Sequence, residues 1–207
     1  MDSQLKPSEI ENRKSKIENS VDLGALLESS GAILNGHFIL SSGRHSAVYF
    51  EKFRILEQPN VLSSLCAAIA AHFADKGIEV VSGPTTGGII IAFEVARQMG
   101  LPALYVENEN GQKTLRRGAS VKPNAKVLVV DDVLTMGTST MEVKDLLTSL
   151  GADVVGVGVL IDRSASPIAF GCRFYTAYRV EAETFAADDL PDWLAAIPAT
   201  KPGTRKG

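Results

Sequence analysis

Cysteine is almost absent from this 207-residue chain, and with it the patterns that mark several other protein classes. Cys66 and Cys172 form no C-x-x-C pair and no zinc-ligand spacing, which argues against a disulfide framework and a zinc site. The net charge is only −3, so no basic field favours nucleic acid or an anionic membrane as a partner. No apolar run approaches the roughly 20 residues that span a bilayer.

The two ends of the chain are polar. Residues 1–20 carry charges of both signs and lack the apolar stretch of a secretory signal, so we expect a cytoplasmic protein with a flexible tail over 1–20. Residues 199–207 are expected to form a second flexible tail. The hydrophobic content of 45% suits one substantial core, which predicts a single domain over residues 21–198.

From residue 59 onward, helical and strand-like patterns alternate. Helices are predicted over 59–77, 89–99, 139–150 and 188–197, and strands over 78–81, 103–106, 127–130, 154–161 and 173–180. This order is typical of an α/β fold with a mainly parallel twisted sheet flanked by helices.

The segment before residue 59 predicts smaller elements. Asp22 is placed to cap a short helix. Two short strands, 32–34 and 38–40, flank Asn35-Gly36, a dipeptide that favours a hairpin turn.

The most informative segment is residues 126–140, which read K-V-L-V-V-D-D-V-L-T-M-G-T-S-T. Its apolar run indicates a strand covered on both faces, and Asp131 and Asp132 end that strand. A turn rich in hydroxyl groups then leads into a helix. Backbone N–H groups at a helix start bind phosphate, and carboxylates accept hydrogen bonds from sugar hydroxyls. A phosphorylated sugar would satisfy both, although Thr138 or Ser139 as a simple helix cap is the plainer alternative.

Two other polar segments, 83–88 and 162–164, also follow predicted strands. Ligands of parallel sheets bind beyond the carboxyl ends of the strands, so we expect all three segments to converge. The common nucleotide fingerprints G-x-x-x-x-G-K-[ST] and strand-associated G-x-G-x-x-G are absent.

The string V-V-D-D-V-L-T-M-G-T-S resembles the phosphoribosyl-diphosphate signature of the type I phosphoribosyltransferases. Four further pieces resemble a divergent orotate branch of that family: G-H-F-I-L-S-S-G-R-H-S (36–46), S-G-P-T-T-G-G-I (82–89), L-R-R-G (115–118) and I-D-R (161–163). The resemblance implies that family's fold with a small N-terminal hood. It also implies a glycosyltransferase that moves ribose 5-phosphate from 5-phosphoribosyl 1-diphosphate to orotate, giving orotidine 5′-phosphate and diphosphate in pyrimidine (UMP) biosynthesis.

The resemblance also implies roles for individual residues. The donor would be bound by Asp131, Asp132, Val133, Leu134, Thr135, Met136, Gly137, Thr138, Ser139, Thr86, Gly87, Lys113, Arg116 and Arg117. Catalysis would rest on Asp131, Asp132, Lys113 and Arg117. Orotate would contact Ser42, Thr135 and Arg163, whose planar guanidinium suits a carboxylate. Mg²⁺ would be held mainly through the substrate, with water-mediated contacts to the two acids.

The polar segment 107–122 is long for a routine connection and contains Gly111 and Gly118 as possible hinges. It suits a mobile lid that closes over the leaving diphosphate. In the family this loop reaches into the neighbouring subunit's site, which implies a homodimer with shared lids. Before the resemblance is considered, a solvated charge run explains the basic residues of this segment equally well.

Two departures from the family pattern leave the base open. Ser41 stands where better-known members have a lysine, and Thr86-Gly87 where they have a tyrosine-lysine pair. A purine or another pyrimidine base is therefore one alternative, and a non-catalytic regulator that binds the donor is another. Arg163 separates the bases, because a carboxylate needs a cation and a neutral base does not. The plainer role for Arg163 is an ion pair with Asp162.

Overall fold

The computed structural model describes residues 22–40, 42–180 and 183–202, so the tail expected over 1–20 lies outside the described residues. The helices are α2 (Leu23–Ser29), α3 (Phe53–Leu56), α4 (Pro59–Phe73), α5 (Gly87–Met99), α6 (Thr138–Ser149) and α7 (Asp192–Ala195). The strands are β1 (Ile33–Ile39), β2 (His45–Phe50), β3 (Val80–Pro84), β4 (Ala103–Glu109), β5 (Gln112–Thr114), β6 (Lys126–Leu134), β7 (Asp153–Asp162), β8 (Arg173–Arg179), β9 (Thr184–Phe185) and β10 (Ala199–Thr200).

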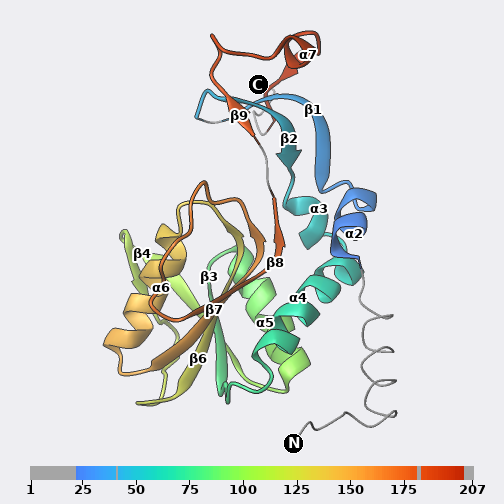
Figure 1. Cartoon of the computed structure of the whole chain (residues 1–207). Helices are drawn as coiled ribbons and strands as arrows, with labels where there is room; N and C mark the ends of the chain where they lie inside the picture. The colour runs from blue at the N-terminus through green and yellow to red at the C-terminus, as the bar shows by residue number, and fades with distance from the viewer. Residues whose placement is uncertain (1–21, 41, 181–182, 203–207) are drawn as a thin grey trace, which may run out of the picture.

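The larger sheet has six strands in the order β5-β4-β3-β6-β7-β8. Strands β4, β3, β6, β7 and β8 pair in parallel, and only β5 runs antiparallel, against β4. In Figure 1, α4 and α5 lie on one side of the sheet and α6 on the other. The predicted α/β class and the mainly parallel sheet are therefore confirmed.

Side chains of β6 alternate between two hydrophobic cores. Leu128 and Val130 pack with α4 and α5, whereas Val127 and Val129 pack in the cluster that includes residues of α6. Successive side chains of a strand point to opposite faces, so a strand buried on both sides reads as an unbroken apolar run. The same alternation continues into the two acids that follow.

The smaller sheet has the order β10-β1-β2-β9 and forms a hood over the larger one. Strand β1 is continuous across Asn35-Gly36, with a register shift against β2 between Asn35 and Phe38. The predicted hairpin turn at Asn35-Gly36 is therefore wrong, because a bulge replaces it.

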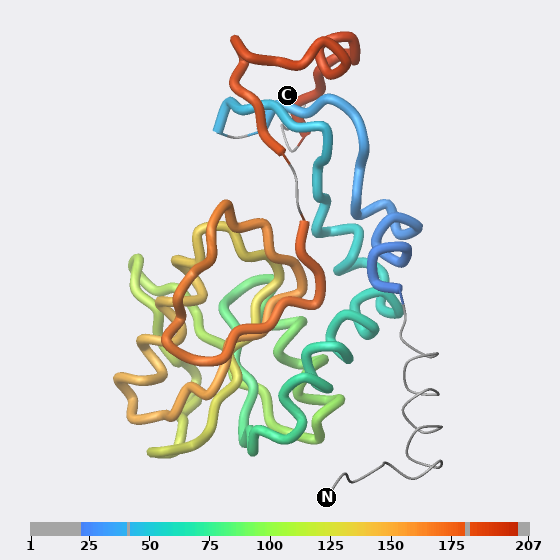
Figure 2. The backbone as a smooth tube through the Cα atoms, in the orientation of Figure 1, coloured from blue at the N-terminus to red at the C-terminus, as the bar shows by residue number. Residues whose placement is uncertain are grey.

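The hood also contains the C-terminal segment of the chain. Ala199 and Thr200 pair in parallel with His37 and Phe38, and Thr200 Oγ1 lies 3.2 Å from the carbonyl oxygen of His37. Figure 2 shows the C-terminal segment, in red, beside the N-terminal strands, in blue. We correct the predicted tail boundary at residue 199, because the first residues of that tail belong to a strand.

Two other predicted elements differ in extent. The start of the lid is a hairpin: β4 runs to Glu109, and β5 returns from Gln112. The final helix, predicted over 188–197, is the single turn α7, followed by β10. Within the ranges that the structure describes, no helix has the length and apolarity needed to cross a membrane.

Candidate active site

The two acids at the end of β6 point to opposite sides of the sheet. Asp131 Oδ2 accepts a hydrogen bond of 3.1 Å from Thr140 Oγ1 in α6. Asp132 Oδ2 lies 2.9 Å from Lys52 Nζ, on the side of α5. A Cβ at Gly87, the first residue of α5, would overlap that same oxygen. Strand alternation thus directs one carboxylate toward the start of each helix.

Burial raises the pKa of Asp131 to about 6, and the neighbouring charge of Asp132 adds to the effect. Hydrogen bonds from the Asp132 N–H and Thr140, together with the charge of Lys52, act in the opposite direction. The carboxylate of Asp131 is therefore ionised at neutral pH and held in a largely desolvated position.

The turn after β6 forms a small pocket of about 110 Å³. It is lined by Asp131, Val133, Leu134, Thr135, Met136, Gly137, Thr138, Ser139 and Thr140. Gly137 is the N-cap residue of α6, with φ of 74°, and no side chain caps the helix. The capping alternative for Thr138 and Ser139 is therefore wrong. The free N–H groups of the first helical turn face a space suited to a phosphate.

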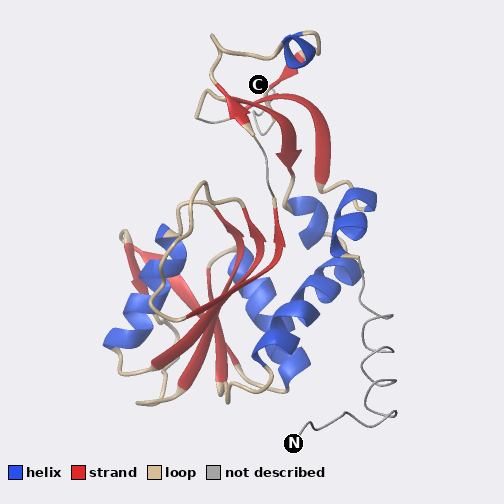
Figure 3. Ribbon diagram, in the orientation of Figure 1, coloured by secondary structure: helices blue, strands red, loops and turns tan. Residues whose placement is uncertain are grey.

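A second pocket, of about 710 Å³, lies between the hood and the larger sheet. It is lined by Ile39, Leu40, Ser42, Tyr49, Thr135, Met136, Arg163, Ala165 and Pro202. The three residues predicted to contact the base, Ser42, Thr135 and Arg163, are thus brought together. Figure 3 shows the carboxyl ends of the central strands directed toward the hood, which is where ligands of parallel sheets bind.

Arg163 lies in this pocket with Tyr49, and no acidic side chain of the described residues pairs with it. Among residues 22–40, 42–180 and 183–202, its guanidinium has no ion pair or side-chain hydrogen bond. Asp162, the plainer partner, instead accepts a 2.6 Å hydrogen bond from Arg179. Burial lowers the pKa of the half-buried Arg163, which reflects the cost of desolvating its cation, and the nearby Tyr49 acts in the opposite direction. An anionic ligand would remove that cost.

A third pocket, of about 670 Å³, lies beside Asp132 at the start of α5. It is lined by Lys52, Phe53, Leu56, Glu57, Thr86, Gly87 and Ile90. The predicted residues Thr86 and Gly87 lie here. Lys52 was not predicted, because it belongs to no motif and reaches the acids only through the fold.

The basic residues of the lid are divided between two places. Lys113 Nζ lies 3.2 Å from Ser139 Oγ, beside the 110 Å³ pocket. Arg116 lies 3.6 Å from Glu107, and Arg117 lies 3.1 Å from the same carboxylate. The structure thus brings Lys113 to the predicted phosphate loop, while both arginines, which follow β5, pair with Glu107 of β4.

The donor set at the acids fits a metal ion only in part. No group of three or more His, Cys, Asp or Glu residues with the arrangement of a metal site occurs in the part of the chain that the structure describes. Asp131 and Asp132 alone would leave most positions around a Mg²⁺ ion to other ligands. The residues therefore fit a metal that arrives with its substrate.

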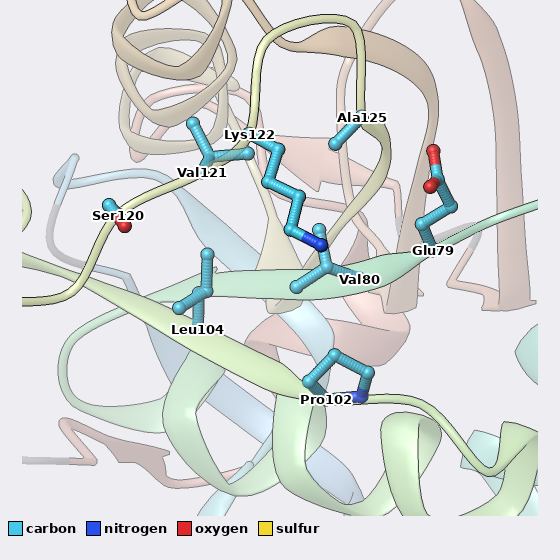
Figure 4. Close-up of a pocket in the computed structure, with 8 residues that line it drawn as sticks. All are labelled: Glu79, Val80, Pro102, Leu104, Ser120, Val121, Lys122 and Ala125. Atoms are coloured by element: carbon cyan, nitrogen blue, oxygen red, sulfur yellow. The ribbon is translucent and has the colours of Figure 1, made fainter.

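A further pocket, of about 220 Å³, lies at the amino ends of β3 and β4. Figure 4 shows the side chain of Lys122 extending across it toward Val80. This end of a parallel sheet is opposite to the one where ligands bind, and neither Asp131, Asp132 nor any other predicted site residue lines the pocket.

Comparison with known proteins agrees with the site. Residues 54–170 match the phosphoribosyl transferase domain family. The chain is 45% identical to the orotate phosphoribosyltransferase of Pelotomaculum thermopropionicum, over 89% of this chain and 97% of that protein. This chain belongs to the orotate phosphoribosyltransferase family. Another orotate phosphoribosyltransferase, from Carboxydothermus hydrogenoformans, is 44% identical over 90% of this chain and 98% of its own length.

A solved structure supports membership of the orotate phosphoribosyltransferase family. The crystal structure of orotate phosphoribosyltransferase from Aeropyrum pernix matches with a TM-score of 0.64 and 30% identity, covering 76% of this chain and 93% of that one. The predicted type I phosphoribosyltransferase fold is confirmed by this match.

Proposed function

We propose that this protein transfers ribose 5-phosphate from 5-phosphoribosyl 1-diphosphate to orotate, forming orotidine 5′-phosphate and diphosphate in pyrimidine biosynthesis. The observation that carries the choice of base is the guanidinium of Arg163 in the 710 Å³ pocket, which has no acidic partner among the residues that the structure describes. A bidentate contact with the carboxylate of orotate would satisfy it, whereas a neutral purine or pyrimidine would cover this half-buried cation without supplying a counter-charge.

The arrangement of the pockets supports this reaction. The 5-phosphate of the donor would occupy the turn at the start of α6, and the ribose hydroxyls would contact Asp131 and Asp132. In a β-nucleotide the base and the 5-carbon project from the same face of the ribose. The phosphate pocket and the base pocket share Thr135 and Met136, so the two groups would lie on one side of the sugar, as the product requires.

Rate acceleration would come from positioning and electrostatics, with no covalent protein nucleophile. Breaking the bond between the anomeric carbon and the diphosphate develops positive charge on the ribose, which the carboxylates of Asp131 and Asp132 would stabilise. Lys113 is already at the phosphate loop. Arg116 and Arg117 would leave their pairs with Glu107 when the lid closes over the diphosphate, because exposed ion pairs of this kind contribute little stability.

The proposal includes Mg²⁺. Asp131 and Asp132 would contact the ion through water, and the diphosphate of the donor would supply most of its ligands. The ion would neutralise negative charge on the leaving diphosphate.

We also propose a homodimer with the lid shared between subunits: Lys113 would stay at the phosphate loop of its own chain, and Arg116 and Arg117 would serve the neighbouring site. Large apolar side chains on α3 and α5 are exposed: Phe53 by 62%, Ile90 by 41% and Phe93 by 64%. They surround the 670 Å³ pocket or lie on the helix that borders it. A second copy covering this surface would bury them next to the active site.

Orotate depletion tests the proposed reaction. Protein, Mg²⁺, phosphoribosyl diphosphate and orotate should together reduce the absorbance of orotate. Arg163→Met should weaken orotate binding by roughly tenfold or more, because a charge-assisted contact is lost, and should leave donor binding nearly unchanged. Arg173→Met, a change at an exposed arginine at the amino end of β8, is the matched control.

Turnover of uracil or a purine with constant orotate absorbance would disprove the choice of base. Donor binding without any turnover would favour the regulator.

A further inference from the structure

Lys52 is a basic residue of the site that the family motifs do not include. It lies between β2 and α3, 80 positions before its partner Asp132, and its Nζ is 2.9 Å from Asp132 Oδ2. In the described part of the chain, it is the only basic side chain that forms an ion pair with either acid. Its side chain is 42% exposed, so it keeps access to the 670 Å³ pocket that it lines.

Gly87 leaves the start of α5 without a basic side chain, at the position where better-known members of the family have a lysine. In this chain the space that a Cβ of residue 87 would take is occupied by Asp132 Oδ2. The backbone of Thr86 and Gly87 is left open to the 670 Å³ pocket. Lys52 approaches the same place from the start of α3 and supplies the missing positive charge.

The orientation of the two acids indicates which part of the donor would occupy the 670 Å³ pocket. Asp131 accepts a hydrogen bond from Thr140 of α6, where the 5-phosphate would bind, and Asp132 faces Gly87 and Lys52. A ribose bridging the acids would therefore place its anomeric end toward Lys52. The diphosphate of the donor projects from the face of the ribose opposite to the 5-carbon and the incoming base. Accordingly, the 670 Å³ pocket shares no lining residue with the base pocket or the phosphate pocket.

Resting on the proposed function, we propose that Lys52 binds the diphosphate of the donor and of the product, in the pocket formed with Thr86 and Gly87. The ammonium group has three donors, so it can contact the diphosphate while it keeps Asp132 in position. The other acid of the pocket, Glu57, is already paired with Arg54 at 2.8 Å and does not compete for Lys52.

Binding of inorganic diphosphate and of ribose 5-phosphate, measured by calorimetry on the full chain with Mg²⁺, tests this assignment. Lys52→Met should weaken diphosphate binding by about tenfold or more, because a charge-assisted hydrogen bond is lost. Ribose 5-phosphate has the 5-phosphate and the hydroxyls but no diphosphate, so its affinity should change by less than about threefold. Lys52→Arg should keep most of the diphosphate affinity, and it remains informative where Lys52→Met fails to fold.

Lys76→Met is the matched control, because it removes a lysine that pairs with Asp75 and does not line the pocket. It should leave the affinity for both ligands unchanged. Equal losses of diphosphate and ribose 5-phosphate in Lys52→Met would overturn the proposal, since they would mean that Lys52 acts only by holding Asp132. Unchanged diphosphate binding would also overturn it. Turnover of another base by the unmodified protein would disprove orotate as substrate without affecting the test of Lys52.

Discussion

Asp131 holds a charge where the fold disfavours one. Its side chain lies between the end of β6 and α6, and burial together with Asp132 raises its pKa from 3.8 to about 6. The folded protein therefore binds this proton more tightly than the unfolded chain does. Stability from this group is present at low pH and is lost as the pH rises from about 4 to about 6. At neutral pH the ionised carboxylate of Asp131 therefore lowers the free energy of unfolding. The proposed contact with the ribose hydroxyls gives this charge a function.

Asp131→Asn tests separately how this charge affects the stability of the fold and the rate of catalysis. Removing the buried charge should stabilise the protein at pH 7 by about 1–2 kcal/mol, below the full value of the pKa shift because the amide fits the hydrogen bonds less well. The same change should reduce kcat by roughly 100-fold or more. Thermal unfolding at pH 7 and pH 4.5 measures the first effect, and the gain should shrink at the lower pH.

Asp145→Asn, at an exposed acid of α6, is the control for Asp131→Asn and should change stability by less than about 0.5 kcal/mol. Near-normal turnover by Asp131→Asn would remove Asp131 from the mechanism. A loss of stability at pH 7 would contradict the assigned cause of the pKa shift.

The site residues that could be predicted from the sequence are charged residues that directly follow a recognisable apolar strand. Asp131 and Asp132 follow an apolar strand, and Arg163 follows the next one, so topology alone brings them to one edge of the sheet. Lys52 could not be found in this way. Its place depends on where β2 ends relative to β6, and this depends on the packing of the hood against the larger sheet.

At the scale of elements, two Asn-Gly dipeptides show how far local signals reach. Asn110 and Gly111 both have positive φ and join β4 to β5 in the hairpin geometry that such a dipeptide favours. At Asn35-Gly36 the chain instead continues as β1, because β2 on one side and β10 on the other both pair with it. The β10 partner is more than 160 residues away, and no local pattern could predict its influence.

Strand β10 gives a test of the hood. Ending the chain after Pro198 removes the pairing with β1 and also Pro202, which lines the base pocket. The KM for orotate should rise several-fold while the affinity for ribose 5-phosphate stays nearly constant, because only the base pocket is opened. Ending the chain after Pro202 keeps β10 and is the matched control. An equal loss of both affinities in the shorter chain would mean that β10 supports the whole fold and not the base pocket.

At the scale of the whole molecule, the active site combines distant parts of the chain. The base pocket takes residues from the N-terminal hood, from the ends of β6 and β7, and from the C-terminal segment. The predicted lid differs, because among the described residues its two arginines form ion pairs only with Glu107 and Glu109 of their own chain. The proposed dimer would bring these arginines to the active site of the neighbouring subunit.

Subunit complementation decides whether the lid serves the neighbouring site. Arg117→Ala alone should lower kcat strongly and donor affinity weakly, because Arg117 would act on the leaving diphosphate during turnover. Asp131→Asn alone should be nearly inactive. Co-expressed with different tags, the two variants should form heterodimers in which the intact lid of the Asp131→Asn subunit closes over the intact acids of the other. Half of the dimers would then carry one working site in two, so the mixture should recover roughly a quarter of normal activity.

Arg97→Ala, at an exposed arginine of α5 paired with Glu94, replaces Arg117→Ala in the control and should be fully active by itself. No recovery in the purified heterodimer would mean that each lid closes over its own subunit, and a monomer in sedimentation would disprove sharing altogether.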